Sequence, residues 1–572
     1  EMANMVLNDA SALKKPLVSI LEPSKASHTF SMTKVICTLG PSSRDTDTLE
    51  AMLEEGMTAA RFDFSGGDSM YHQETLNNLR KAMMNTRKLC AVIMDTSGPE
   101  VTIQNPENKR IEIKSGQEIT LTSDTSKALT GDLFPVSFPD LAAHATPGVQ
   151  VFVGQYLFTG SETSSVYLTV KRIEGNDVVC ESHNGATLEG QMMTVHISNV
   201  KNSLPILTPG DESNIKLFGK QNNIDFLSLS FCRSVADINT AREVLDAAGL
   251  QHTQILCKIE SKEGLQNLKD IVESPLVYGC IVSRGNLGID IPAEKMFLTQ
   301  KAVLQMCNMA GKPAIMTRVV DTMTDTPRPT RAEATDVANA VLDGADCIML
   351  GAETVRGKYP VQAVRTIVKI CLESEKVFDY ASFYRVVLDS QIDKGGVILS
   401  HEDSLASSAV RAADKVGAAL IIGFTETGRT GRLLSKYRPP MPILIVVVPR
   451  LVSNSISWTF SGDHAARQAL LHRGTLPLLA DPMMGSKAGG AEDDSILQFA
   501  VSRAHSMGLV KAGDHVVVSQ RVSTDAIVKV VTVGLDVPLN NHKLVKGQFG
   551  SEANLLSLAE KVAATADYLA AQ

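Results

Sequence analysis

The feature that most constrains the fold is a regular alternation of two kinds of segment. Eight short apolar runs, rich in β-branched residues, alternate with longer segments whose apolar residues have helical spacing. The runs are continuously apolar, which is typical of parallel strands buried on both faces. They span Lys34–Thr38, Ala60–Ser65, Leu89–Asp95, Asp225–Ser230, Gln254–Ile259, Gly279–Ser283, Pro313–Thr317 and Cys347–Gly351. The helical segments include 45–56, 70–86, 234–248, 292–310, 331–343 and 360–376, and a capping box, Thr330 to Glu333, opens one of them. Eight such units predict an α/β chain built on a closed (β/α)₈ TIM barrel.

The alternation breaks between Gly98 and about Leu207, where apolar and polar residues alternate at period two. The alternating runs are 111–114, 118–122, 151–153, 166–170 and 177–180, and they predict an all-β domain inserted after the third barrel strand. After about residue 378, a helix at 403–416, strands at 419–424 and 443–448 and a β segment at 514–533 predict a C-terminal α/β domain. The expected domains are an N-terminal arm 1–30, a barrel 31–98 and 208–378, a lid 99–207 and a C-terminal domain 379–572.

Composition excludes several classes of protein. Apolar residues make up 44% and charged residues 21%, as in ordinary globular proteins. The net charge of −8 argues against a nucleic-acid-binding protein held by a basic field, and no apolar stretch approaches the ~18 residues that span a membrane. The nine cysteines include no C-x-x-C pair, and residues 1–30 show no secretory pattern. We therefore expect buried reduced thiols in a soluble cytoplasmic protein, with no nucleic-acid or membrane partner.

Polar residues follow the predicted barrel strands, at the end where barrel enzymes place their chemistry. They are Arg61, Asp63, Ser65, Asp95, Thr96, Lys258, Glu260, Arg284, Asn286, Thr317, Arg318 and Glu353. Guanidinium groups, a lysine and carboxylates on one face indicate an anionic substrate held with a hard cation. The alternative is a ring of salt bridges at the barrel mouth, which the convergence of the whole set disfavours.

Two of these strand ends carry a more specific signal. Lys258 and Glu260 are two apart in a strand and share a face, so the carboxylate can hold Mg²⁺ while the ammonium neutralises a phosphoryl group or an enolate oxygen. The segment Ser283 to Gly288 contains two glycines and allows close approach of the backbone to an anion. The sequence contains no P-loop motif.

Taken together, the motifs resemble those of the pyruvate kinase family, most closely its plant-type cytosolic branch. The resemblance covers about 31–570 and rests on the segments Thr33–Ser43, Ala60–Ser65, Met94–Glu100, Lys258–Glu260, Ser283–Ile289 and Arg328–Gly344. It implies a barrel, a mobile lid, a C-terminal domain and a homotetramer. The implied reaction is phosphoryl transfer from phosphoenolpyruvate to ADP, giving pyruvate and ATP in the last step of glycolysis, with Mg²⁺ (or Mn²⁺) and K⁺ as cofactors.

The resemblance also implies roles for individual residues. Arg61 would hold the substrate phosphate, and Lys258 would stabilise the transferring phosphoryl group and the enolate oxygen. Glu260 would bind the divalent ion, and Thr317 would lie near the carbon that gains a proton. Backbone N–H groups at Arg284, Gly285 and Asn286 would receive the substrate carboxylate. The implied K⁺ ligands are Asp63, Ser65, Asp95 and Thr96, and Glu100 stands where an acidic residue accompanies K⁺ dependence.

Several positions depart from the family pattern. Asp63 replaces an asparagine, which preserves an oxygen ligand. Asn286 replaces the aspartate that completes the divalent site, so the amide should weaken ion binding. Thr102 replaces an arginine on the lid side, and the segment 199–202 lacks a basic Lys-Lys-Gly stretch, which leaves the lid contacts to the nucleotide open.

A loop in the C-terminal domain carries a possible effector site, made of Thr425, Thr427, Gly428, Arg429 and Thr430. It precedes a predicted helix, could cradle a phosphate, and resembles the family loop for one phosphate of fructose 1,6-bisphosphate. The alternative is an ordinary helix cap. The segment 520–525 lacks the Gly, Trp and Arg character of the loop that holds the second phosphate, so we expect little activation by this sugar.

Two other functions remain as alternatives at this stage. One is a carbon–carbon lyase acting on a keto acid with the same Mg²⁺–enolate chemistry, although the inserted lid and the run Arg328–Gly344 count against it. The other is a non-catalytic, effector-sensing partner subunit, for which Asn286 and Thr102 would mark a degraded site. Formation of ATP from phosphoenolpyruvate and ADP separates the three.

Overall fold

The computed structural model describes residues 30–154, 165–190, 192–197, 203–392, 399–449, 451–453, 458–480, 492–522 and 525–537. The predicted N-terminal arm therefore lies outside the described residues, apart from residue 30. The chain forms two compact units. One comprises Glu1–Leu79, Leu89–Lys394 and Leu470–Arg473, and the other comprises Arg80–Lys88, Gly395–Ala469 and Gly474–Gln572.

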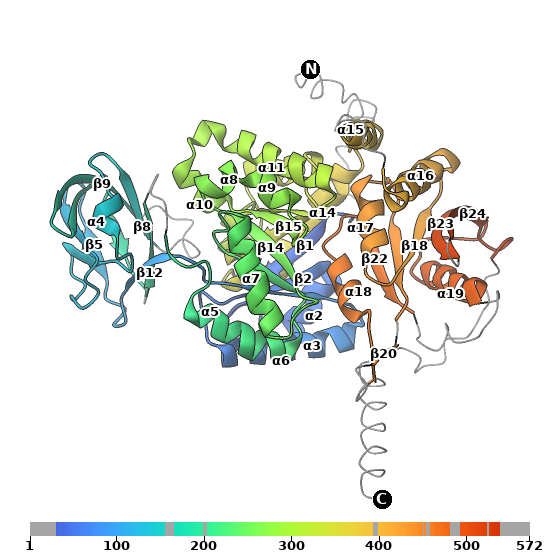
Figure 1. The fold of residues 1–572 in the computed structure, drawn as a ribbon, viewed down its shortest axis with the longest axis horizontal. Coiled ribbons are helices and arrows are strands. Elements are labelled where there is room, and N and C mark those ends of the chain that lie inside the picture. Colours follow the sequence, from blue (N-terminus) through green and yellow to red (C-terminus); the bar gives the residue numbers. More distant parts are fainter. Residues whose placement is uncertain are drawn as a thin grey trace, which may run out of the picture. The chain divides into compact units, whose positions relative to one another are not determined.

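A closed barrel of parallel strands forms the centre of the first unit (Figure 1). Its order is β1-β17-β16-β15-β14-β13-β3-β2, which confirms the predicted barrel. The strands are β1 (Lys34–Thr38), β2 (Met57–Asp63), β3 (Ala91–Asp95), β13 (Phe226–Leu229), β14 (Gln254–Ile259), β15 (Val277–Val282), β16 (Ala314–Thr317) and β17 (Cys347–Leu350). Side chains such as Ile36, Ile93, Leu256 and Ile315 fill the barrel interior. The second strand starts earlier than predicted because Met57 and Ala59 already pair with β1.

Helices follow the barrel strands, and local signals set their ends. The longer ones are α2 (Thr46–Glu55), α3 (Ser69–Thr86), α7 (Val235–Ala247), α11 (Met296–Ala310), α12 (Arg331–Leu342), α14 (Pro360–Glu375) and α15 (Tyr380–Ile392). The shorter ones are α5 (Pro209–Asn214), α6 (Lys220–Asn222), α8 (Lys262–Gln266), α9 (Leu268–Glu273), α10 (Arg284–Asp290) and α13 (Ala352–Val355), with a π-helical turn at Ile215–Gly219 and 3₁₀ turns at Ala293–Lys295 and Asp321–Thr324. Both hydrogen bonds of the predicted capping box, between Thr330 and Glu333, are present. The predicted helix 292–310 begins later, at Met296, because a 3₁₀ turn precedes it.

The insertion after β3 is a β domain, as predicted. Its larger sheet has the order β4-β12-β8-β9-β10-β6-β7. The strands are β4 (Val101–Gln104), β6 (Glu118–Thr122), β7 (Leu133–Pro135), β8 (Gln150–Gly154), β9 (Ser165–Glu174), β10 (Asp177–Ser182) and β12 (Met192–Ile197), and β5 (Ile111–Ile113) pairs with β11 (Ala186–Leu188) beside a short helix α4 (Leu141–His144). The domain has its own apolar core, which includes Leu121, Phe134 and Leu168. Because its first and last strands, β4 and β12, pair with each other, the chain enters and leaves the domain at one place.

The second unit contains a sheet with the order β22-β19-β18-β23-β24. Its elements are α16 (His401–Val416), β18 (Leu420–Thr425), α17 (Arg429–Lys436), β19 (Ile443–Val447), α18 (Asp463–Ala469), β22 (Thr475–Leu479), α19 (Glu492–Ser506), β23 (His515–Val522) and β24 (Asp525–Thr532), with β20 (Leu451–Ser453) and β21 (Trp458–Phe460) as a separate pair. The predicted segment 514–533 is a hairpin, in which Val522 pairs with Asp525.

All nine cysteines are free and buried, as predicted. Cys180 belongs to β10 of the inserted domain, and residues 379–572 contain no cysteine. Within the described ranges, no helix combines the length and the apolar character needed to cross a membrane.

Candidate active site

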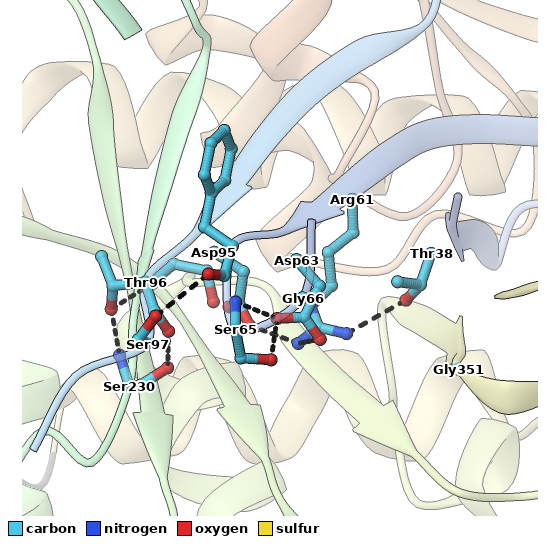
Figure 2. A network of polar contacts seen from close by, with 12 residues as sticks. Thr38, Arg61, Asp63, Ser65, Gly66, Asp95, Thr96, Ser97, Ser230 and Gly351 are labelled. Atoms are coloured by element: carbon cyan, nitrogen blue, oxygen red, sulfur yellow. Dashed lines mark hydrogen bonds and ion pairs between the residues drawn. The ribbon is translucent and has the colours of Figure 1, made fainter. Parts of the chain in front are cut away.

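Arg61 lies at the centre of the polar network at the ends of β2 and β3 (Figure 2). Its Nη2 is 3.0 Å from Asp63 Oδ2 and also pairs with Asp95, while Nη1 donates to Thr38 Oγ1 at 3.1 Å. Burial opposes the charged form, but Asp63 and Asp95 outweigh it and raise the pKa of the guanidinium above its ordinary value. Arg61 is therefore a buried, permanent cation at the barrel mouth.

The four predicted K⁺ ligands lie around this arginine and are unequally available. Asp63 Oδ1 accepts hydrogen bonds from the Ser65 backbone at 3.1 Å and the Ser65 hydroxyl at 2.6 Å. Asp95 Oδ1 is buried and has no hydrogen-bond partner among the described residues. Thr96 Oγ1 donates to the Ser228 carbonyl at 3.3 Å and accepts from the Ser230 amide at 3.1 Å (Figure 2). The orphaned Asp95 oxygen fits a cation, whereas the Thr96 hydroxyl already has partners on the fourth barrel strand.

Lys258 projects from the end of β14 into the same cluster. Its Nζ is 3.3 Å from Asp95 Oδ2, 3.5 Å from Glu260 Oε1 and 3.0 Å from Ser230 Oγ. Burial lowers the pKa of the ammonium, but Asp95 and Glu260 more than reverse this and the pKa lies above its ordinary value. Lys258 therefore stays charged throughout the physiological range.

Glu260 accepts hydrogen bonds from three directions. Its Oε2 accepts from the Phe231 backbone N–H at 2.8 Å, and its Oε1 accepts from the Ser283 hydroxyl at 2.8 Å and from the Asn286 amide at 2.7 Å. Within the part of the chain that the structure describes, no three His, Cys, Asp or Glu side chains form a ready-made metal cluster. A divalent ion at Glu260 would need further oxygens from substrate and water, which is how proteins usually hold Mg²⁺.

Arg284 and Thr317 contact each other and form a second group of polar contacts at the barrel mouth. Arg284 Nε donates to the Thr317 carbonyl at 3.0 Å, and its Nη2 pairs with Asp336 at 2.7 Å. The Thr317 hydroxyl donates to the Val282 carbonyl at 2.8 Å. Gly285 and Asn286 lie in the first turn of α10, where backbone N–H groups face outward from the helix start. The side chain of Arg284 is thus engaged by the protein, and the substrate-binding role expected for Arg284 falls to its backbone N–H.

Two carboxyl groups, the buried Glu353 and the half-buried Glu100, have pKa values raised towards neutral pH. Burial, with some repulsion from Asp321, raises the pKa of Glu353 to about 7, and its Oε1 finds no partner in the described residues. Burial also raises the pKa of Glu100 to about 7, although a 2.8 Å hydrogen bond from Thr194 opposes the shift.

Of the lid-side positions that depart from the family pattern, Thr102 lies in β4 and its backbone N–H donates to Ser137. The segment 199–202 lies outside the described residues.

The candidate effector loop in the second unit has most of its polar groups engaged. Thr425 Oγ1 accepts from the Gly428 amide at 3.0 Å, and the Thr430 hydroxyl donates to the Phe424 carbonyl at 3.1 Å. Arg429 pairs with Glu402 at 2.6 Å. None of these contacts caps α17 with a side chain, because the residue at its N-cap is Gly428, and both interpretations of the loop remain open.

Sequence reasoning missed several contributors to the site, including Thr38, which accepts from Arg61. Ser230 and Phe231 follow β13, another strand end at which no polar residue was singled out, and both contact the Lys258–Glu260 pair. The predicted run Asp225–Ser230 already ended on a serine, which was the available signal. Asp336, from α12, lies in the segment Arg328–Gly344 that carries the family resemblance, but spacing gave it no role because its partner is on another element.

Comparison with known proteins shows the family and removes one of the two alternatives. The family model "Pyruvate kinase, barrel domain" matches residues 30–364, and "Pyruvate kinase, alpha/beta domain" matches residues 403–531. The chain belongs to the pyruvate kinase family. Pyruvate kinases transfer a phosphoryl group from phosphoenolpyruvate to ADP in glycolysis and use a divalent metal ion, so the lyase alternative is wrong.

Individual pyruvate kinases match over most of their length. The chain is 50% identical over 522 residues to "Pyruvate kinase 2, cytosolic" of Oryza sativa subsp. indica, covering 91% of this chain and 98% of that protein. It is 42% identical over 507 residues to "Pyruvate kinase, cytosolic isozyme" of Nicotiana tabacum, covering 88% of this chain and 96% of that protein. A crystal structure of a pyruvate kinase from Cryptosporidium parvum matches with a TM-score of 0.76 at 31% identity, covering 88% of this chain and 96% of that one.

Proposed function

We propose that the strand-end cluster is the catalytic site of a Mg²⁺- and K⁺-dependent pyruvate kinase. The observation that carries the proposal is Lys258, which lies between Asp95 and Glu260 and keeps its charge. A fixed cation in a buried site stabilises charge that develops during phosphoryl transfer far better than water does. The same network of charges counts against the non-catalytic alternative, because burying it without a ligand is costly.

Each charged group has a distinct part in the proposed mechanism. Arg61 holds the phosphate of phosphoenolpyruvate with the guanidinium that Asp63 and Asp95 orient. Lys258 faces the transferring phosphoryl group and then the enolate oxygen. Thr317 lies beside the enolate carbon as it gains a proton. A divalent ion held by Glu260 would neutralise substrate oxygens, with Asn286 beside it as an uncharged neighbour.

The cation requirement gives the direct test. ATP formation is measured from phosphoenolpyruvate and ADP with Mg²⁺, and K⁺ is then replaced by tetramethylammonium at constant ionic strength. We expect activity with K⁺ and a large loss of kcat without it, since Asp63 and Asp95 offer hard oxygens to a monovalent ion. Full activity without K⁺ would refute the monovalent site, and no ATP formation under any condition would refute the catalytic assignment.

Regulation, assembly and location follow as further proposals. We expect little or no activation by fructose 1,6-bisphosphate, because the segment 520–525 lacks the Gly, Trp and Arg character of a second phosphate loop and Arg429 is paired with Glu402. A marked fall in the half-saturating phosphoenolpyruvate concentration on adding micromolar sugar would contradict this. The domain boundaries at 31–98, 99–207, 208–378 and 379–572 remain proposals, as does the homotetramer, which light scattering can test. The rice and tobacco relatives are named cytosolic, which supports a cytosolic location.

A further inference from the structure

The guanidinium of Arg284 joins the start of α10 to the turn that follows β16. Its Nε donates to the Thr317 carbonyl at 3.0 Å, and its Nη2 donates to the Arg318 carbonyl. Its Nη1 donates to Asp336 Oδ1 at 3.0 Å and to Gln300 Oε1 at 3.3 Å. One planar group thus links residues from α10, β16, α11 and α12.

The turn after β16 needs such support. Arg318 has a φ of +55°, in the left-handed region that a residue with a side chain rarely adopts. Such a conformation persists only where the surroundings fix it. The side chain of Arg318 is itself paired with Asp321 at 3.0 Å. Arg284 donates to the carbonyls of Thr317 and Arg318, which belong to the peptide bonds before and after the strained residue.

Asp336 fixes the far edge of the guanidinium. Its Oδ2 lies 2.7 Å from Nη2 and its Oδ1 accepts from Nη1, which is the two-pronged geometry that orients an arginine most strictly. The side chain of Arg284 is 15% exposed, so its direction depends mainly on its protein partners. Asp336 itself has no role in the proposed chemistry.

We propose that Asp336 is a positioning residue for the reaction: through Arg284 it holds Thr317 in register with the first turn of α10. The inference rests on the proposed role of Thr317 beside the enolate carbon. In that step the carbon–carbon double bond of the enolate takes up a proton at the methylene carbon, and the C–O bond becomes the ketone of pyruvate. Loosening the turn should therefore impair proton transfer more than binding of ADP.

A second arginine–aspartate pair, Arg242 and Asp246, serves as a control for Arg284 and Asp336. It lies near the start of β14, whereas Arg284 lies near the end of β15. Arg242 of α7 donates to the carbonyls of Leu250 at 2.7 Å and Thr253 at 2.8 Å, and its Nε lies 2.9 Å from Asp246 Oδ1. Its side chain is 16% exposed. Asp246→Asn therefore removes a carboxylate from a comparable arginine clamp, held by one carboxylate oxygen instead of two, that touches no proposed site residue.

The experiment compares Asp336→Asn, Asp336→Glu and Asp246→Asn in the full chain. It measures kcat, KM for each substrate, melting temperature, and the exchange of pyruvate methyl protons with D₂O by NMR. We expect Asp336→Asn to lower kcat and the exchange rate about tenfold, consistent with losing a charge-assisted contact, with KM for ADP changed less than about twofold. Asp336→Glu should recover part of both rates. Asp246→Asn should lower the melting temperature similarly and leave both rates within about twofold.

Several outcomes would overturn the inference. Wild-type exchange and kcat in Asp336→Asn would do so, as would an equal loss of exchange in Asp246→Asn. If Asp336→Asn does not fold, a folded Asp336→Glu with unchanged exchange also refutes it, whereas a reduced exchange rate supports it. A wild-type enzyme that forms no ATP refutes the proposed function itself, and so the two failures are distinguishable.

Discussion

Two lysines near opposite ends of the barrel strands, the buried Lys34 and the half-buried Lys258, have pKa values shifted in opposite directions. Burial lowers the pKa of Lys34, at the start of β1, to about 7, although Cys347 and Glu375 oppose the shift. At the end of β14, Asp95 and Glu260 overcome the same penalty and raise the pKa of Lys258. Glu375 also accepts the backbone N–H of Thr33 at 2.7 Å and that of Met32 at 3.1 Å. The comparison teaches that burial alone does not make a catalytic cation; two carboxylates directed at the ammonium do.

The largest expected effect separates the two lysines by activity. Lys258→Met should lower kcat by ~10²–10³, or ~3–4 kcal/mol, because it removes a preorganised charge from the site of developing negative charge. Lys34→Met, the matched substitution at the other end, should keep kcat within about twofold, since Lys34 lies at the start of β1 and interacts with Phe30, Cys347 and Glu375. Steady-state ATP formation measures both. A Lys258→Met enzyme with more than half the wild-type kcat would remove the distinction.

The second prediction separates the lysines by the pH dependence of stability. The folded pKa of Lys34, about 7, lies below the ordinary value of 10.5, so between these values the unfolded chain binds more protons and stability rises with pH. The stability of the wild type relative to Lys34→Met should rise by up to ~1.4 kcal/mol per pH unit above pH 7. The raised pKa of Lys258 means that its contribution to folding stability is fully present at every pH below the ordinary lysine pKa. The stability of the wild type relative to Lys258→Met should therefore not change between pH 7 and 9.

Denaturant unfolding of the three proteins at pH 7, 8 and 9 measures these differences. Parallel pH profiles for wild type and Lys34→Met would mean that Lys34 keeps its proton when folded. A rising difference for Lys258→Met would mean that its two carboxylates do not hold the charge.

The smallest expected effect concerns the negative charge beside Glu260, at the end of the barrel where the proposed active site lies. Asn286→Asp should tighten binding of a divalent ion about tenfold, because a second carboxylate would face Glu260 where the amide now donates at 2.7 Å. Without the ion the same pair of charges should lower the melting temperature. Titration of activity and of the melting temperature with Mg²⁺ measures both. An unchanged Mg²⁺ requirement would show that Asn286 does not adjoin the ion.

The fold was predictable because its signals are local. Each barrel strand is a continuous apolar run, and the capping box at Thr330 and Glu333 forms as its spacing indicates. The cluster of Arg61, Lys258 and Glu260 was also predictable, because parallel strands bring their ends together on one face.

The directions of side chains and protons were not predictable from spacing. Arg284 follows a strand as the other candidates do, yet its guanidinium contacts the carbonyls of Thr317 and Arg318. The raised pKa of Glu353 depends on burial and on Asp321, which no sequence pattern joins to it. These features arise from contacts between distant segments, which hydrophobic periodicity does not record.

The distribution of buried thiols makes the protein a reporter of its own opening. A thiol shielded from water reacts with a disulfide reagent only when the surrounding structure opens, so its labelling rate measures local unfolding. Cys180 reports on the inserted domain, whereas residues 379–572 are silent because they contain no cysteine. Thiol labelling of the unmodified enzyme, followed by mass spectrometry with and without substrate, can therefore measure local unfolding of the inserted domain separately from that of the barrel.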